Sequence, residues 1–218
     1  ALRELAHCYE ARMHAAVARP YDGPGLPYEV FHLSAALATL AEVLHDPDIH
    51  VRAVLCYSPQ PNEMQKERFV QAYLEAGKPE EALKWLEGEW DRREPTRKRL
   101  LSDALGLLGR TAEGAEIRRE LFEASLSTFD LTRWLEHVPE EARPQARDRA
   151  RDLAMKHGDA IVAAILLLEL DDPAGAEEAL VQAHATIDGR DYGTLVPLAK
   201  ALREQGCPRG ETAVLRAL

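Results

Sequence analysis

The sequence predicts an all-α protein, a right-handed α-α superhelix of about a dozen helices that pack as antiparallel pairs. Three observations support this fold class. Apolar residues recur three and four positions apart, as one face of a helix requires. Glycine and proline interrupt this pattern at regular intervals. Hydrophobic residues make up 46% of the chain and aromatic residues only 6%, and abundant alanine and leucine favour helices over sheets.

Residues 69–86, FVQAYLEAGKPEEALKWL, give the clearest helix pair. Tyr73 belongs to the apolar face of the first helix, and Gly77 supplies a residue that adopts positive φ and ends it. Pro79 suits the first turn of the second helix, because its φ is already fixed there. The small side chain of Ala82 allows the two helix axes to approach closely.

The same punctuation recurs along the chain. The residues that begin the second helix of each expected pair are separated by intervals of 32, 28, 34 and 35 residues. They are Pro79, Thr111, Pro139, Pro173 and Pro208. A helix–turn–helix unit repeated about every 34 residues is the pattern of a stacked helical repeat.

These residues resemble the tetratricopeptide repeat family, which places a large residue four positions before the inter-helix glycine and an alanine five after it. Tyr73, Gly77 and Ala82 match that pattern, and Gly109 and Gly206 are preceded in the same way by leucines. The second unit departs from the pattern, with glycine in place of the alanine, and the third unit is short and out of register. Residues 62–218 also look like an uncharacterised bacterial helical-repeat family, and this resemblance implies a fold without an activity.

We expect residues 1–61 to form an N-terminal helical cap and residues 62–218 to form the degenerate repeats as one continuous solenoid. The cap should contain helices over residues 1–18, 28–44 and 48–57. The proline- and glycine-rich residues 20–27 are interpreted as a plain connector, with a functional loop as the alternative.

The repeat region should begin with a capping box, in which Asn62 and Gln65 cap one helix reciprocally. Residues 90–98 are expected to be a charged connector, with Thr96 capping the next helix. A short helix is predicted over residues 131–135 and a long one over residues 140–156.

Residues 159–170 are apolar on every side, so the helix predicted there must be covered on every side. We expect the C-terminal helices to cover it, with a second subunit as the alternative. The chain is therefore expected to be a monomer or a homodimer.

The formal net charge of −10 argues against general nucleic-acid binding, which requires cations to replace counterions. Three scattered cysteines form no disulfide framework, which indicates a reducing, cytoplasmic environment. The sequence has no secretory signal at its start and no apolar run long enough to cross a bilayer, so we expect no membrane association.

No motif for nucleotide binding or nucleophilic catalysis occurs, so we expect a non-enzymatic protein without a cofactor and name no catalytic residue. The segment from His45 to His50 carries two histidines and two aspartates, but a proline interrupts it. We interpret it as a turn between helices and expect no metal site. The stripe of Arg143, Arg147 and Arg151 is interpreted as a salt-bridged surface.

The function predicted from this architecture is that of a scaffold or adaptor, since stacked helix pairs form a concave surface suited to recognition. The resemblance to tetratricopeptide units implies that first helices line this surface and bind a protein or an extended peptide. The positions concerned are Glu67, Gln71, Glu75, Arg99, Asp103 and Leu107.

Two alternatives remain open. The first is a sensor of a small ligand near residues 21–28. The second is a nucleic-acid-associated regulator that uses the basic cluster between Arg92 and Arg99, which Glu89, Asp91 and Glu94 dilute.

Overall fold

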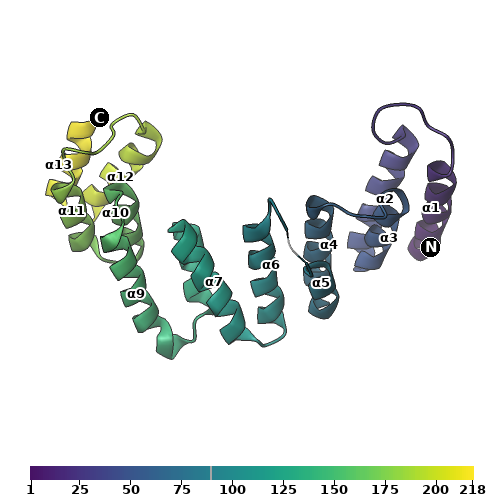
Figure 1. The fold of residues 1–218 in the computed structure, drawn as a ribbon, viewed down its shortest axis with the longest axis horizontal. Helices are drawn as coiled ribbons and strands as arrows, with labels where there is room; N and C mark the ends of the chain where they lie inside the picture. The colour runs from purple at the N-terminus through teal and green to yellow at the C-terminus, as the bar shows by residue number, and fades with distance from the viewer. Residues whose placement is uncertain (89) are drawn as a thin grey trace. The chain divides into compact units, whose positions relative to one another are not determined.

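The computed structural model describes residues 1–88 and 90–218, and these residues form thirteen α-helices and one short 3-10 helix, without a β-strand. The all-α class is therefore confirmed. The chain divides into two compact units, Ala1–Arg110 and Thr111–Leu218 (Figure 1). Glu89, an acidic residue beside the basic cluster, lies outside the described residues.

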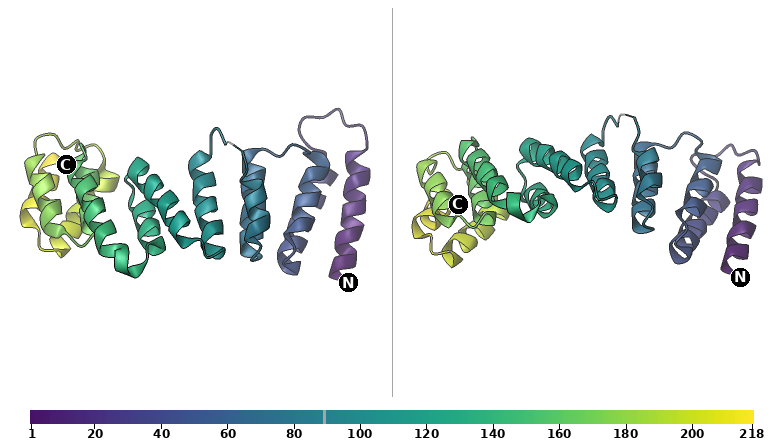
Figure 2. Two further views of the ribbon diagram at one scale, coloured as in Figure 1. Left: turned by 60° about the horizontal axis from the view of Figure 1, so that its bottom comes forward. Right: turned by 90° about the horizontal axis from the view of Figure 1, so that it is seen from below.

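Unit 1 contains six helices in its described residues, and they stand side by side with similar axis directions (Figure 2). Helix α1 packs on α2, α2 on α3, and α4 on α5, while α3 also contacts α4. The helices are α1 (Leu2–Val17), α2 (Tyr28–Leu44), α3 (Pro47–Tyr57), α4 (Glu63–Glu75), α5 (Pro79–Trp85) and α6 (Glu94–Leu107).

Unit 2 contains the remaining helices, of which α7 and α8, α10 and α11, and α12 and α13 pack as pairs. Helix α9 packs on α10, and α11 packs on α13. The elements are α7 (Thr111–Ser125), α8 (Thr128–His137), η1 (Glu140–Ala142), α9 (Arg143–Lys156), α10 (Ala160–Glu169), α11 (Pro173–Gln182), α12 (Tyr192–Glu204) and α13 (Pro208–Ala217).

Five helices end in the same hydrogen-bonded turn. In each, a residue with left-handed backbone conformation comes after the helix, and the next N–H donates to the carbonyl five residues before it, at N···O distances of 2.8 or 2.9 Å. The donors are Asp46, Lys78, Arg110, Asp172 and Cys207. Glycine occupies the left-handed position at Gly77, where an L side chain would be strained. His45 and Asp171 adopt the same conformation without being glycine.

The hydrophobic core of unit 1 consists of two clusters in its described residues. One is formed by α1, α2 and one face of α3, and the other by the opposite face of α3 with α4, α5 and the middle of α6. Helix α3 therefore joins them: Ile49 and Ala53 belong to the first cluster, and Val51 and Val54 to the second. Unit 2 buries its apolar side chains in one cluster that runs from α7 to α13.

Several sequence predictions agree closely with this fold. Helix α2 has the predicted bounds, and α1 and α3 differ from theirs by no more than one residue at either end. The capping box is present, since Gln65 N donates to Asn62 Oδ1 and Asn62 N donates to Gln65 Oε1.

Three local predictions were wrong. Residues 90–98 are not all a connector, because α6 already begins at Glu94, with Pro95 in a first turn that tolerates proline and no side-chain cap from Thr96. Helix α8 extends beyond residues 131–135 at both ends, because the Ser127 hydroxyl accepts from Asp130 N and caps its start. Residues 140–156 begin as the 3-10 helix η1 before α9.

The boundary between the chain's two compact units falls after Arg110, whereas the division predicted from the sequence falls after residue 61. The turn at His45 has the same geometry as the later ones, so α2 and α3 form a helix pair like α4 and α5. The helix pair therefore already occurs in the segment that was expected to be a cap.

Candidate functional site

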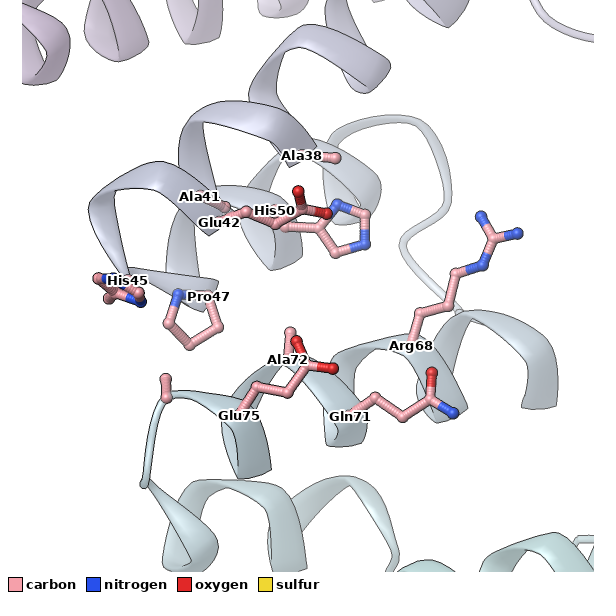
Figure 3. Close-up of a pocket in the computed structure, with 11 residues that line it drawn as sticks. Ala38, Ala41, Glu42, His45, Pro47, His50, Arg68, Gln71, Ala72 and Glu75 are labelled. Carbon is pink, nitrogen blue, oxygen red and sulfur yellow. The ribbon is translucent and has the colours of Figure 1, made fainter.

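An open groove lies between α2 and α4 in unit 1, with α3 as its floor. Two adjoining pockets of about 630 Å³ and about 400 Å³ form it, and Ala38, His50 and Arg68 line both. Figure 3 shows the larger pocket, with Glu42 and His50 on one side and Gln71 and Glu75 on the other. We call the whole feature the α2–α4 groove.

Small side chains keep the α2–α4 groove open. Ala35, Ala38 and Ala41 line it from α2, while Ala72 and Ala76 line it from α4 and its end. An alanine side chain ends at Cβ, so facing alanines cannot fill the space between two helices. The leucines Leu33, Leu37 and Leu40 lie on the other side of α2, where they are buried in the core.

Gln65 in the smaller pocket accepts hydrogen bonds from the Ser58 hydroxyl and from Asn62 N, whereas four other charged or amide side chains of the groove have no partner among the described residues. Among the described residues, the side chains of Glu42, Arg68, Gln71 and Glu75 form no hydrogen bond or ion pair. Elsewhere in unit 1 charges are commonly paired, as in Arg52–Glu10 at 2.7 Å. The groove therefore presents polar groups that are available to a ligand.

His50 sits at the junction of the two pockets, where its ring meets the ring of Phe69 edge-on at a centroid distance of 5.7 Å. Its Nδ1 atom is buried and has no hydrogen-bond partner among the described residues. Burial lowers the pKa of His50, and the positive charge of Arg68 lowers it further, while Glu42 opposes them. His50 is therefore neutral at pH 7.

The smaller pocket is the apolar end of the groove. Leu26 and Phe31 line it while remaining 42% and 62% exposed, and Val54 and Phe69 contribute from α3 and α4. Exposed side chains of this size beside a pocket are suited to apolar contact with a ligand. The groove thus has an apolar end at Phe31 and a polar end at Glu42 and Glu75.

The predicted partner-binding residues are not brought together at one site. Gln71 and Glu75 line the α2–α4 groove, whereas Glu67 pairs with Arg93 at 2.6 Å. Arg99 and Asp103 are half-buried on α6, and Leu107 near its end is 58% exposed.

The segment from His45 to His50 is divided between two roles. His45 and His50 line the groove, while Asp48 accepts a 2.5 Å hydrogen bond from the Tyr73 hydroxyl and lies 3.7 Å from Lys78 Nζ. Burial, with the Asp48 carboxylate as a second cause, raises the pKa of Tyr73. In the part of the chain that the structure describes, no three His, Cys, Asp or Glu side chains are placed to hold a metal ion.

Two of the basic side chains between Arg92 and Arg99 are engaged within unit 1. Arg93 pairs with Glu67, and Arg97 binds Glu94 and the carbonyl oxygen of Leu86. Such pairing lowers the positive charge that this cluster can present to a phosphate backbone.

Sequence reasoning missed the α2 wall of the groove and Arg68. Phe31, Ala35, Ala38 and Glu42 are spaced at intervals of four, three and four residues, which places them on one face of α2. This face differs from the one that buries the leucines of α2, so the second stripe was a usable signal.

Fold and site together define a class: an all-helical protein of packed helix pairs with an open groove that is apolar at one end and charged at the other. The chain belongs to a family of unknown function, DUF6880, whose match covers residues 31–218. That match begins in α2 and includes every residue of the groove on α2 from Phe31 onward. No curated protein matches the chain. None of the helices in residues 1–88 and 90–218 is both long and apolar enough to cross a membrane.

Proposed function

We propose that the protein is a non-catalytic interaction module, a scaffold or adaptor, that binds a segment of a partner protein in the α2–α4 groove. The observation that carries this proposal is that four polar side chains of the groove form no hydrogen bond or ion pair with the described residues. Glu42, Arg68, Gln71 and Glu75 have no partner among the described residues, and exposed Phe31 stands at the other end. Unpaired polar groups beside exposed apolar surface are the composition of a recognition site.

We also propose that the helix pairs stack as a right-handed, tetratricopeptide-like superhelix. The repeated turn geometry supports this arrangement, since the left-handed residues His45, Gly77 and Gly109 recur at intervals of 32 residues. An array of similar pairs places equivalent helices beside each other, and α2 and α4 are equivalent first helices. The groove between them then lies on the surface that such arrays use for binding.

The cellular setting that we propose is the cytoplasm of a bacterium. Cys8, Cys56 and Cys207 are free thiols, which a reducing compartment maintains. Burial raises the pKa of Cys56 and of Cys207, so both are protonated at neutral pH and behave as small apolar side chains.

A small-ligand sensor is the second candidate, and the size of the pockets supports it. Volumes of about 630 Å³ and 400 Å³ fall within the usual range for sites that bind small molecules. The connector between α1 and α2 contributes Leu26 to the smaller one. The regulator that would use the cluster from Arg92 to Arg99 has no comparable support, because Arg93 and Arg97 are already paired.

Site-specific photo-crosslinking in cells tests the proposal. A photoreactive amino acid at Ala38 or Gln71, in the groove, should give the same protein adduct, identified by mass spectrometry. The same amino acid at Lys84, exposed on α5 away from the groove, should not give it.

The rival outcomes are distinct. Equal adducts from Lys84 would show contact without a specific site. No adduct from the groove positions, together with a thermal shift on addition of a metabolite extract, would favour the sensor.

A further inference from the structure

We propose that the α2–α4 groove binds an extended peptide segment that carries an apolar side chain and, about five residues away, a lysine or arginine. This inference rests on the proposed function, because it specifies the chemistry of the partner that the groove receives.

The distance between the two ends of the groove sets the spacing. Phe31 and Glu42 lie eleven residues apart on α2. At a rise of 1.5 Å per residue, this separation is about 16 Å along the helix axis. An extended chain advances about 3.3 Å per residue, so about five residues cover that distance.

The charge at the polar end favours a cation. Glu42 from α2 and Glu75 from α4 line opposite walls of the larger pocket (Figure 3). Neither carboxylate has an ion-pair partner in residues 1–88 and 90–218. The nearby His50 is neutral, so it does not balance them. A lysine or arginine between the two walls would form charge-assisted hydrogen bonds with both carboxylates.

Arg68 limits where a positive charge can lie along the segment. It lines both pockets and so lies between the apolar end and the two carboxylates. A basic residue at this middle position would be repelled, which disfavours a run of basic residues. The net charge of −10 on the whole chain adds long-range attraction for a cationic partner.

An extended backbone suits the groove better than a helix. A helix satisfies its own amide groups, whereas an extended segment needs external donors and acceptors. The Gln71 amide offers two donors and an acceptor and is unpaired within the described residues. The alanines of both walls leave room for a backbone to approach them.

Selection from a displayed library of random nine-residue peptides, on the full chain, tests the inference. Enriched peptides should share an apolar residue and a basic residue four to six positions apart. For a selected peptide, fluorescence polarisation should show affinity falling about tenfold or more in Glu42→Gln and in Glu75→Gln, the loss expected for a charge-assisted hydrogen bond.

Two variants control this measurement. Glu80→Gln removes an exposed carboxylate on α5, outside the groove, and should leave affinity within about twofold. The double variant Glu42→Lys/Glu75→Lys should reject the selected peptide and bind the version in which glutamate replaces its basic residue. This reversal separates a direct charge contact from a change in fold.

The other outcomes overturn the inference in distinguishable ways. Enrichment of acidic peptides that depend on Arg68 would refute the basic residue while leaving the proposed function intact. No enriched peptide, with crosslinking from Ala38 still positive, would show a partner that is folded or is a second copy of this chain. Failure of both experiments would refute the inference and the proposed function together.

Discussion

Helices α2 and α10 are both rich in apolar residues, but their outer faces are covered by the rest of the chain to different extents. On α10, Ile161, Val162 and Ile165 pack against the unit 2 core together with Ile187, which comes from the segment after α11. On α2, Phe31 is 62% exposed, and no later segment among the described residues of unit 1 covers it. The apolar helix that the sequence singled out is thus partly covered by its own chain, although Ile161, Val162 and Ile165 also line a pocket of about 480 Å³. Helix α2 leaves the large side chain of Phe31 exposed.

This difference shows that apolar composition alone does not locate an open face. The chain after α10 continues as α11, which packs on α10, and Ile187 then packs against the same core, so α10 is partly covered. The chain after α2 instead forms the floor helix α3 and then the opposite wall of the groove. The open face is where the intervening residues are small and the charges are unpaired.

The largest expected effect on the free energy of unfolding comes from placing a charged residue on the outer face of α10 and comparing it with the same change on α2. Ile165→Asp should lower the free energy of unfolding by about 3 kcal/mol, because it removes apolar burial and places a carboxylate against the core. Phe31→Asp should change it by about 0.5 kcal/mol or less, because the aspartate is solvated. Urea denaturation followed by circular dichroism measures both.

Equal losses in the two variants would remove the distinction between the covered and the open face. Sedimentation of Ile165→Asp provides a second check. A folded variant that merely changes from dimer to monomer would place a subunit interface at α10 instead of an intramolecular contact.

A smaller effect on the free energy of unfolding distinguishes an alanine buried between two helices from an alanine that lines the groove. Ala82 is fully buried between α4 and α5, so Ala82→Leu should cost about 1–3 kcal/mol through overpacking. Ala35 is exposed in the smaller pocket, so Ala35→Leu should leave the free energy of unfolding nearly unchanged while blocking partner crosslinking from Ala38. Unchanged crosslinking in Ala35→Leu would show that the partner does not enter the apolar end.

The smallest expected effect is a pH dependence of the free energy of unfolding, which arises from His50 on the floor of the groove. The pKa of His50 is lowered in the folded protein, chiefly by burial, from an ordinary value of about 6.5. As pH falls below that value, the unfolded chain takes up a proton at this position before the folded chain does, so stability decreases. His50→Gln should flatten this part of the stability profile between pH 7 and pH 5. An unchanged slope would show that His50 is solvated like an ordinary surface histidine.

Much of the fold could be predicted because glycine and proline in the sequence indicate where its turns lie. Gly77 and Gly109 indicate a left-handed residue at the end of a helix, and Pro79 indicates the first turn of the next helix. His45 adopts the same conformation without being glycine, so the first helix pair had Pro47 at its second helix but no glycine before it, and it was assigned to a cap. The start of α8 was missed although Ser127 caps it with a side chain typical of that position.

The groove was only partly predictable, because it depends on a distance between two helices. Gln71 and Glu75 were proposed from their positions on a first helix, and both line the groove. Arg68 could not be assigned from the pattern alone, and the stripe that contains Ala38 does not reveal which helix it faces, since both roles arise from how α3 separates α2 from α4.

Helix α3 has a further consequence for dynamics, because its opposite faces belong to different core clusters. We therefore expect the two walls of the groove to open separately, so that backbone amides of α2 and α4 exchange with solvent at different rates in the free protein. A segment seated between the walls contacts both of them and is released when either opens. A bound segment would then make the amides of α2 and of α4 exchange with solvent at the same rate, because neither wall could open without releasing it. Ligand binding would in this way couple the two core clusters of unit 1.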